Sequence, residues 1–234
     1  MRQIQKRNEP RLLTQWRAAH QNDPNFGYGL IGADLGLQIR RALVLEQGAL
    51  CAYTGRRISE HTSHIEHLKP QARCRDGEDI SYANMVACVP KPNNEEQLPY
   101  GAHKKGSWPD ATDAHLFVSP LRPGCGPRFS FTFRGQIKAT VATDVAAAET
   151  IKRLGLDHEV LIKFRQAAID ATLRARGGGP ASLNIKSARK RMETLERAER
   201  NNAMLEEFCF VLQHALRKHI QRLEEMRARR AQHR

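Results

Sequence analysis

The chain has 234 residues, a formal charge of +13 and a pI near 10. Hydrophobic residues make up 40% of it, which is enough for a folded core and excludes a wholly disordered basic tail. The charge favours a nucleic acid or an acidic protein as partner over a protein that is merely basic, and we expect one large domain or a small core with added lobes.

The cysteines and the apolar runs indicate an intracellular protein. Five cysteines are an odd number for a disulfide scaffold, so we expect reduced thiols. No apolar run approaches the roughly 20 residues that a membrane helix needs. The N-terminal MRQIQKRNEPRLL also lacks the apolar stretch of a secretory signal. The sequence therefore predicts a cytoplasmic location and no membrane partner.

The first half of the chain begins with two predicted helices, at 10–21 and 30–47. The second has apolar residues at helical spacing and ends at Gly48. Segment 50–118 is irregular and rich in His, Pro, Asn and Gly, which is typical of a site built on loops. In FSFTFRGQIKATV, 129–141, alternate phenylalanines precede a turn, and this pattern predicts a β-hairpin.

The second half is predicted to be helical. We expect helices at 144–155, at 157–176 with Asp157 as N-cap, and without interruption from 185 to 230. Between the last two, GGGPAS at 177–182 is a flexible break. The last helix has a basic face that either contacts phosphates or is simply solvated. It also has an apolar stripe, typical of a core or helix-pairing surface, formed by Met192, Leu195, Leu205, Phe208, Leu212, Leu216, Leu223 and Met226.

The predicted fold class is therefore α+β and predominantly α-helical. We expect three parts: an N-terminal helical segment at 1–44, a central part with a β-hairpin at 45–142, and a C-terminal helical region at 143–234. The C-terminal region, with its apolar stripe, is the part that we expect to dock a partner.

The central part carries the side chains that a small nuclease site needs. Such a site uses a base of near-neutral pKa, a divalent cation with carboxylate or imidazole ligands, and a group that fixes the tautomer of the base. Within and after CAYTGRRISEHTSHIEHLKPQARC (51–74), Glu66 and His103 can bind the cation, His67 can be the base and Asn84 can shape the site. Glu66 and His67 can take different roles because adjacent side chains on an extended chain point opposite ways.

EHLKPQARCRDGEDISYANMVAC resembles the HNH, or ββα-metal, nuclease motif. LEQGALCAYT, HIEHLKP, SYANMVAC and TIKRLGLD, with Leu161 and Arg165, are similar to the PtuB family, the HNH proteins found with Septu anti-phage systems and some retrons. The resemblance runs from about residue 40 to residue 170. It implies a small ββα-metal nuclease core within 45–142 that cleaves phosphodiester bonds of nucleic acid with Mg or Mn.

The resemblance also implies a defence system with further components. The expected partner is a PtuA-like ATPase of the ABC/SMC type that regulates the nuclease, with a retron reverse transcriptase and its DNA in the retron setting. Whether the substrate is DNA or RNA stays open, because the fold does not settle it.

By this resemblance, His67 is the general base, Glu66 a metal ligand and Asn84 the residue that orients the base. His103, in HKKG, is the last metal ligand, and His64 is an additional ligand or a residue behind the ligands.

Four basic residues near these positions are candidate phosphate contacts: Lys104, Lys105, Arg73 and Arg75. For Arg73 and Arg75, a solvated loop is the alternative.

The resemblance implies a structural zinc site that this chain does not fully carry. Relatives place CxxC pairs here. In this chain the position of the second cysteine is taken by Thr54, three residues after Cys51, and by Lys91, three residues after Cys88. A four-cysteine zinc site is therefore not available. We expect a packed, metal-free version in preference to a zinc held by Cys51, Cys88 and a nearby histidine.

A non-catalytic module is the alternative to the enzyme. Such a module would bind nucleic acid or the ATPase through its basic helices, and the incomplete cysteine set favours it. The presence of Glu66, His67 and Asn84 together favours the nuclease.

Overall fold

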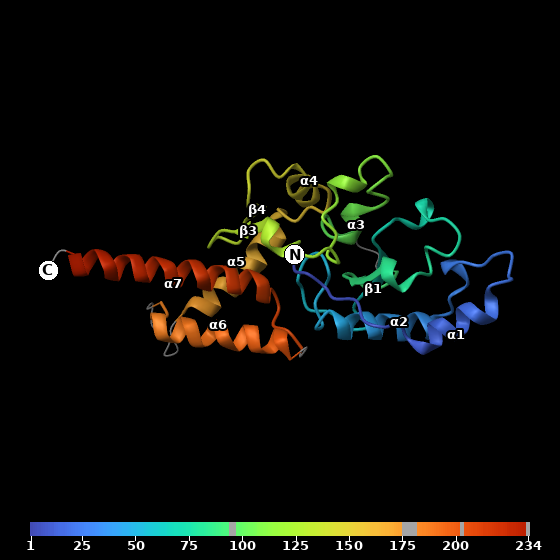
Figure 1. The fold of residues 1–234 in the computed structure, drawn as a ribbon, viewed down its shortest axis with the longest axis horizontal. Helices are drawn as coiled ribbons and strands as arrows, with labels where there is room; N and C mark the ends of the chain where they lie inside the picture. The colour runs from blue at the N-terminus through green and yellow to red at the C-terminus, as the bar shows by residue number, and fades with distance from the viewer. Residues whose placement is uncertain (94–96, 175–181, 202–203, 233–234) are drawn as a thin grey trace.

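The computed structural model describes residues 1–93, 97–174, 182–201 and 204–232, and these form a mostly helical α+β fold with two small antiparallel hairpins (Figure 1). This confirms the predicted fold class at the level of α+β, mostly helical. The helices are α1 (Arg11–His20), α2 (Ala33–Glu46), α3 (Ala102–Lys105), α4 (Val145–Arg153), α5 (Glu159–Leu173), α6 (Ile185–Arg200) and α7 (Cys209–Gln232). The strands are β1 (His64–His67), β2 (Met85–Cys88), β3 (Phe129–Phe131) and β4 (Ile137–Ala139).

The first hairpin lies within the segment that the sequence shows as irregular. β1 and β2 pair antiparallel, with Glu66 opposite Val86 and His67 opposite Met85. α2 packs against both strands through a buried face that includes Ile39 and Leu43. The one-turn helix α3 follows in chain order, so this region has the succession strand, strand, short helix.

The segment Glu46–Gln47 fastens this hairpin to the rest of the core. Gln47 is 1% exposed, and its amide exchanges two hydrogen bonds with the backbone of Ala87, at 2.7 and 2.8 Å. Its Nε2 also donates to the carbonyl of Leu50 at 2.8 Å. The buried carboxylate of Glu46 accepts from Lys6 at 2.6 Å and from the Tyr82 hydroxyl at 3.1 Å. Glu46 and Gln47 of LEQGALCAYT thus have structural roles in the core.

The second hairpin, β3–β4, confirms the β-hairpin predicted at 129–141. It is anchored by Arg165 of α5, which is 2% exposed and donates to the carbonyls of Gly135 and Leu156, both at 2.7 Å. The predicted N-cap of α5, Asp157, is wrong. The cap is His158, whose Nδ1 accepts from the Val160 N–H at 3.3 Å, because the helix begins one residue later than predicted. Residues 177–181 of the predicted break lie outside the described residues.

The continuous helix predicted from 185 to 230 is wrong, because α6 and α7 form an antiparallel pair. The chain between them folds into the core, where Leu205 and Phe208 are each 2% exposed. Their N–H groups donate to the carbonyls of Gly48 and Gly55, at 2.9 and 3.0 Å. Phe208 has a φ of 58°, which no helix accommodates. The buried contacts outweigh helix continuation.

Figure 1 shows α6 and α7 side by side at one end of the molecule, with α1 and α2 at the other. The inner part of the predicted apolar stripe, up to Leu216, is buried. Its outer end is not, and Met226 is 40% exposed. Among the described helices, none combines the length and the apolar character that crossing a bilayer requires.

We predict that Gln47→Leu lowers the free energy of unfolding by roughly 2–4 kcal/mol, because the buried Ala87 N–H loses its acceptor and the Leu50 carbonyl loses the Gln47 donor, while the Ala87 carbonyl keeps only the Ala52 N–H. Urea unfolding followed by circular dichroism measures this. The control Gln166→Leu, at an exposed position of α5, should stay within about 0.5 kcal/mol. Equal stability of the two variants would contradict the anchoring role.

Candidate functional site

The predicted metal ligands come together on one side of β1. His64 and Glu66 lie on the same face of the strand, since alternate residues share a face. Their closest atoms, His64 Nε2 and Glu66 Oε2, are 3.9 Å apart, which is an ion-pair contact longer than a hydrogen bond. The ring of His103, at the start of α3, lies 6.0 Å from the ring of His64.

Lys105 occupies the centre of this cluster. Its Nζ lies 2.8 Å from Glu66 Oε1 and donates to the carbonyl of His67 at 2.9 Å. Only 1% of the lysine side chain is exposed. The Tyr53 hydroxyl donates to the same Glu66 oxygen at 3.2 Å. The structure thus places the Lys105 ammonium, predicted as a phosphate contact, in a buried position against Glu66. Lys104, by contrast, is exposed.

His67 lies on the opposite face of β1 and is 6% exposed. Its Nε2 is 2.7 Å from the carbonyl of Asp79. A carbonyl can only accept, so Nε2 carries the proton and Nδ1 keeps the free lone pair of the neutral ring. Within the described residues, Nδ1 has no hydrogen-bond partner. Burial lowers the pKa of His67, and the Asp79 carbonyl offsets this only in part. The ring is thus a neutral base at physiological pH.

Two residues to which the sequence assigns no role, Tyr28 and Asp79, hold this histidine. Tyr28 packs edge-on against the His67 ring, with centroids 4.7 Å apart and planes at 87°. The Tyr28 N–H donates to the Asp79 carboxylate at 2.7 Å. Asp79 therefore fixes the imidazole through its carbonyl and the covering tyrosine through its side chain. The first contact uses a backbone atom, which leaves no signal in residue type.

The Asn84 side chain makes no hydrogen bond to His67, so it does not orient the base directly in the way that the resemblance implies. Its Oδ1 accepts from the Lys69 N–H at 2.8 Å. Its Nδ2 donates to the carbonyls of Lys69 and Glu78, at 3.1 and 3.3 Å. Asn84 thus closes the loop between β1 and β2 that carries Asp79, and it acts on the base through that loop.

The ionisation of the metal-ligand cluster differs from that of His67. Burial disfavours the charged form of His64, but the neighbouring Glu66 and the Pro90 carbonyl outweigh it and raise the pKa of His64. Burial likewise disfavours the Glu66 carboxylate, but His64 and Lys105 outweigh it and lower the pKa of Glu66. The pKa of His103 is lowered by burial and by the nearby His64.

The donor chemistry fits a divalent cation at His64 and Glu66 but not at His103 as it lies. The Nδ1 of His64 is bonded to the Pro90 carbonyl at 2.7 Å, which leaves Nε2 as a possible ligand. The Nδ1 of His103 accepts from the Leu98 N–H at 3.0 Å, so its lone pair is already used. Accordingly, no three His, Cys, Asp or Glu side chains in the described part of the chain are arranged to hold a metal ion.

Cys51 and Cys88 lie together in the core, each at most 2% exposed. Burial raises the pKa of a thiol, but hydrogen bonds with the Cys88 thiol, Thr54 and the backbone near Val89 outweigh it and lower the pKa of Cys51 to about 6. Burial raises the pKa of Cys88. The two thiols lack a third metal donor within the described segments, and all five cysteines are free.

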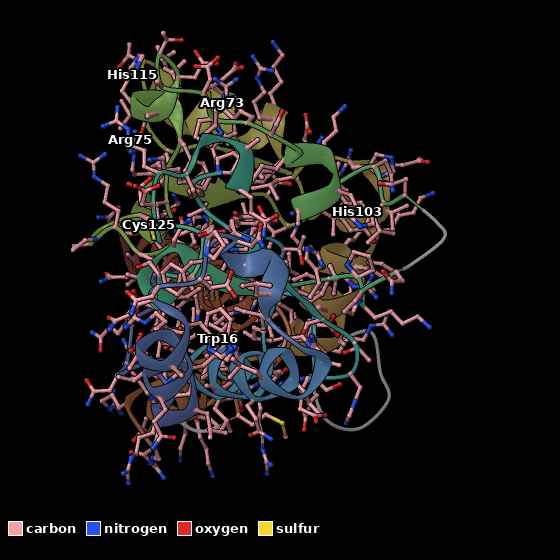
Figure 2. The ribbon with its side chains drawn as sticks, turned by 90° about the vertical axis from the view of Figure 1, so that its right-hand side faces the viewer. Trp16, Arg73, Arg75, His103, His115 and Cys125 are labelled. Carbon is pink, nitrogen blue, oxygen red and sulfur yellow. The ribbon has the colours of Figure 1, made fainter. Side chains whose placement is uncertain are left out.

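Arg73 and Arg75 lie apart from this cluster. Both are exposed on the loop after β1. Figure 2 shows them together with His115 at the top of the view, well separated from His103. They line the same cavity as Asn84, so a phosphate that they bind lies near Asn84 and apart from His103.

Comparison with known proteins yields neither a family model nor a curated protein that matches this chain. The chemistry of the site must therefore carry the functional conclusion.

We predict that an NMR titration gives His64 a midpoint above 6.5 and His67 a midpoint below 6.5, since Glu66 favours the first imidazolium and burial disfavours the second. Glu66→Gln should lower the His64 midpoint, whereas the exposed Glu225→Gln should leave it unchanged. A single common midpoint for both histidines would contradict the assigned environments.

We predict that Lys105→Met strengthens the binding of Mn²⁺ by about tenfold or more, because it removes the ammonium that occupies Glu66. Isothermal titration calorimetry measures the affinity. Lys104→Met is the matched control, since it removes a neighbouring but exposed charge. Weaker binding by the Lys105 variant would show that the lysine supports the ligands and does not compete for them.

Proposed function

We propose that this protein is an HNH-type endonuclease that hydrolyses phosphodiester bonds of nucleic acid. The observation that carries the proposal is the state of His67, a buried neutral imidazole held at Nε2 by the Asp79 carbonyl with Nδ1 free. A base of this kind, at the end of a strand beside an ionised Glu66, is suited to activating water. The formal charge of +13 supports a polyanionic substrate.

In the proposed reaction, His67 Nδ1 takes a proton from a water molecule as its oxygen forms a bond to phosphorus. The P–O bond to the leaving sugar oxygen breaks, and that oxygen receives a proton from solvent. Asp79 keeps the ring in the required tautomer, and Tyr28 excludes water from its face. A divalent cation, Mg or Mn, held by His64 and Glu66 would stabilise the negative charge on the phosphate and the leaving oxygen.

The wider proposal is that the nuclease serves an anti-phage defence system. It is supported by the similarity of LEQGALCAYT, HIEHLKP and TIKRLGLD to the PtuB family. On this proposal, a PtuA-like ATPase regulates the enzyme in the cytoplasm. The C-terminal region from residue 143, with the projecting pair α6 and α7, is its docking element.

A specific observation favours a second candidate, a binding module without catalysis. The Lys105 ammonium pairs with the Glu66 carboxylate, and the His103 Nδ1 lone pair accepts from the Leu98 N–H. In this arrangement neither group is free to bind a metal ion. A module of this kind would bind nucleic acid or the ATPase through its basic surface. The two candidates differ in one measurable property, cleavage that depends on His67.

We predict that wild-type protein with Mg²⁺ or Mn²⁺ and its ATPase partner cuts at least one of plasmid, linear duplex, single-stranded DNA or tRNA. His67→Ala should lower the rate by about 10²-fold or more, because the base is lost. The acid limb of the pH–rate profile should lie below pH 6.5, since His67 must be neutral and its pKa is lowered. His115→Ala, at an exposed histidine, is the control.

Equal cleavage rates for wild type and His67→Ala would contradict the assignment of His67 as the general base. Absence of cutting on every substrate, combined with tight binding of nucleic acid, would favour the binding module.

A further inference from the structure

A cavity of 490 Å³ opens beside the loop that follows β1. Its floor is apolar and is formed by the buried residues Leu68, Pro109 and Phe117, and the exposed Ala114 also lines the cavity. We call it the Phe117 cavity. Leu68 comes directly after His67, and the other three come from segment 109–117, so the cavity lies where these two parts of the chain meet. Its volume is in the range of pockets that hold a small organic ligand or one nucleotide.

The rim of the Phe117 cavity is basic and is formed by Lys69, Arg73 and Arg75. Lys69 is neutralised by a short ion pair with Glu78. Arg73 and Arg75 are exposed and make no ion pair within the described residues. The apolar floor and the two free guanidinium groups are complementary to a base with an attached phosphate.

The two carboxylates on the rim are engaged locally. Glu78 pairs with Lys69 and accepts from the Arg75 N–H at 2.7 Å. Asp110 Oδ1 accepts from the N–H and hydroxyl of Thr112, at 2.9 and 2.7 Å, and from the Asp113 N–H at 2.9 Å. The charge that remains for an incoming ligand is therefore that of Arg73 and Arg75.

The cavity is coupled to the candidate base by short covalent and hydrogen-bonded paths. Asn84 lines it and bonds both backbone groups of Lys69, two residues after His67. Figure 2 shows Arg73, Arg75 and His115 gathered on the same side of the molecule. A nucleotide in the cavity would thus lie against the loop that directly follows His67, the proposed general base.

We propose that the Phe117 cavity takes one unstacked nucleotide of the substrate, with its base against Leu68 and Phe117 and its phosphate on Arg73 and Arg75. This inference rests on the proposed nuclease function. A base inside a duplex cannot leave its stack without an energetic cost, so the cavity selects single-stranded or looped nucleic acid over intact duplex.

The test uses the full chain with His67→Ala, without divalent cation, so that binding is measured apart from cleavage. The probes are a fluorescein-labelled single-stranded DNA 12-mer, an RNA 12-mer of the same sequence, and the DNA 12-mer as a duplex. Fluorescence anisotropy gives each affinity over a range of salt concentrations.

Two changes address the two halves of the cavity. Arg73→Ala with Arg75→Ala should weaken single-strand binding about tenfold or more and reduce the salt slope by about 1.4, or about 0.7 for each lost phosphate contact. The control pair Arg11→Ala with Arg41→Ala removes equal charge from exposed positions elsewhere. Ala114→Trp should place a bulky ring in the lining of the cavity and weaken single-strand binding at least fivefold while duplex binding stays within twofold. Ala148→Trp, exposed on α4, is its control.

The inference is overturned if the cavity variants bind the single strand as tightly as their controls. It is also overturned if the variants lose the same affinity for single strand and duplex, or if the His67→Ala protein binds none of the probes. Displacement of the 12-mer by a deca-glutamate peptide of similar charge would identify an acidic protein ligand instead and also overturn it. Cleavage by protein with His67 intact is scored separately. If the protein cuts and the cavity variants cut at the same rate, the nuclease proposal holds and the nucleotide subsite is rejected. If the cavity variants bind more weakly but neither they nor the wild type cuts, the subsite holds and the nuclease proposal is rejected.

Discussion

The buried ammonium of Lys105 holds the candidate site together. It joins α3 to β1 through two contacts, to the Glu66 carboxylate and to the His67 carbonyl, with 1% of its side chain exposed. Taking a lysine and a glutamate out of water costs several kcal/mol for each ion, and the loss is offset only when the geometry is good and further hydrogen bonds are made. Tyr53 and the His67 carbonyl supply those bonds. The same pair decides which groups on this face remain open to a ligand.

The two faces of β1 have opposite electrostatic character, and this follows from strand geometry. On one face, His64 and Glu66 favour each other's charged forms. On the other, His67 is buried against Tyr28 and held neutral. Neighbouring residues in a strand point to opposite sides, so a charged ligand cluster and a neutral base can be adjacent in sequence without sharing an environment. The proposed division of roles, with Glu66 as metal ligand and His67 as base, depends on this separation.

Much of the polar pattern in the chain supports the hairpin and is remote from its chemistry. The Gln47 amide makes the hydrogen bonds with the Ala87 backbone that a neighbouring strand would otherwise make. Arg165 donates to the turn carbonyl of Gly135. Buried polar side chains of this kind are retained because each leaves a costly unpaired group when removed. Glu46 and Gln47 of the EQG motif, and Arg165 after LGLD, therefore stabilise the packing of the scaffold. Within the described residues, the segment around His67 and Glu66 carries the proposed base and metal ligands.

Local sequence patterns determined the helices at 10–21, 30–47 and 144–155, the hairpin at 129–141 and the candidate pair Glu66–His67, because periodicity and residue type act within a few positions. The tertiary structure alone decided that Asp79 orients His67, that Lys105 turns inward, and that the last helix breaks at Leu205 and Phe208. Each of these depends on a backbone group or a buried partner distant in the chain. Such long-range contacts outweigh local preference, and residue type at one position carries no record of them.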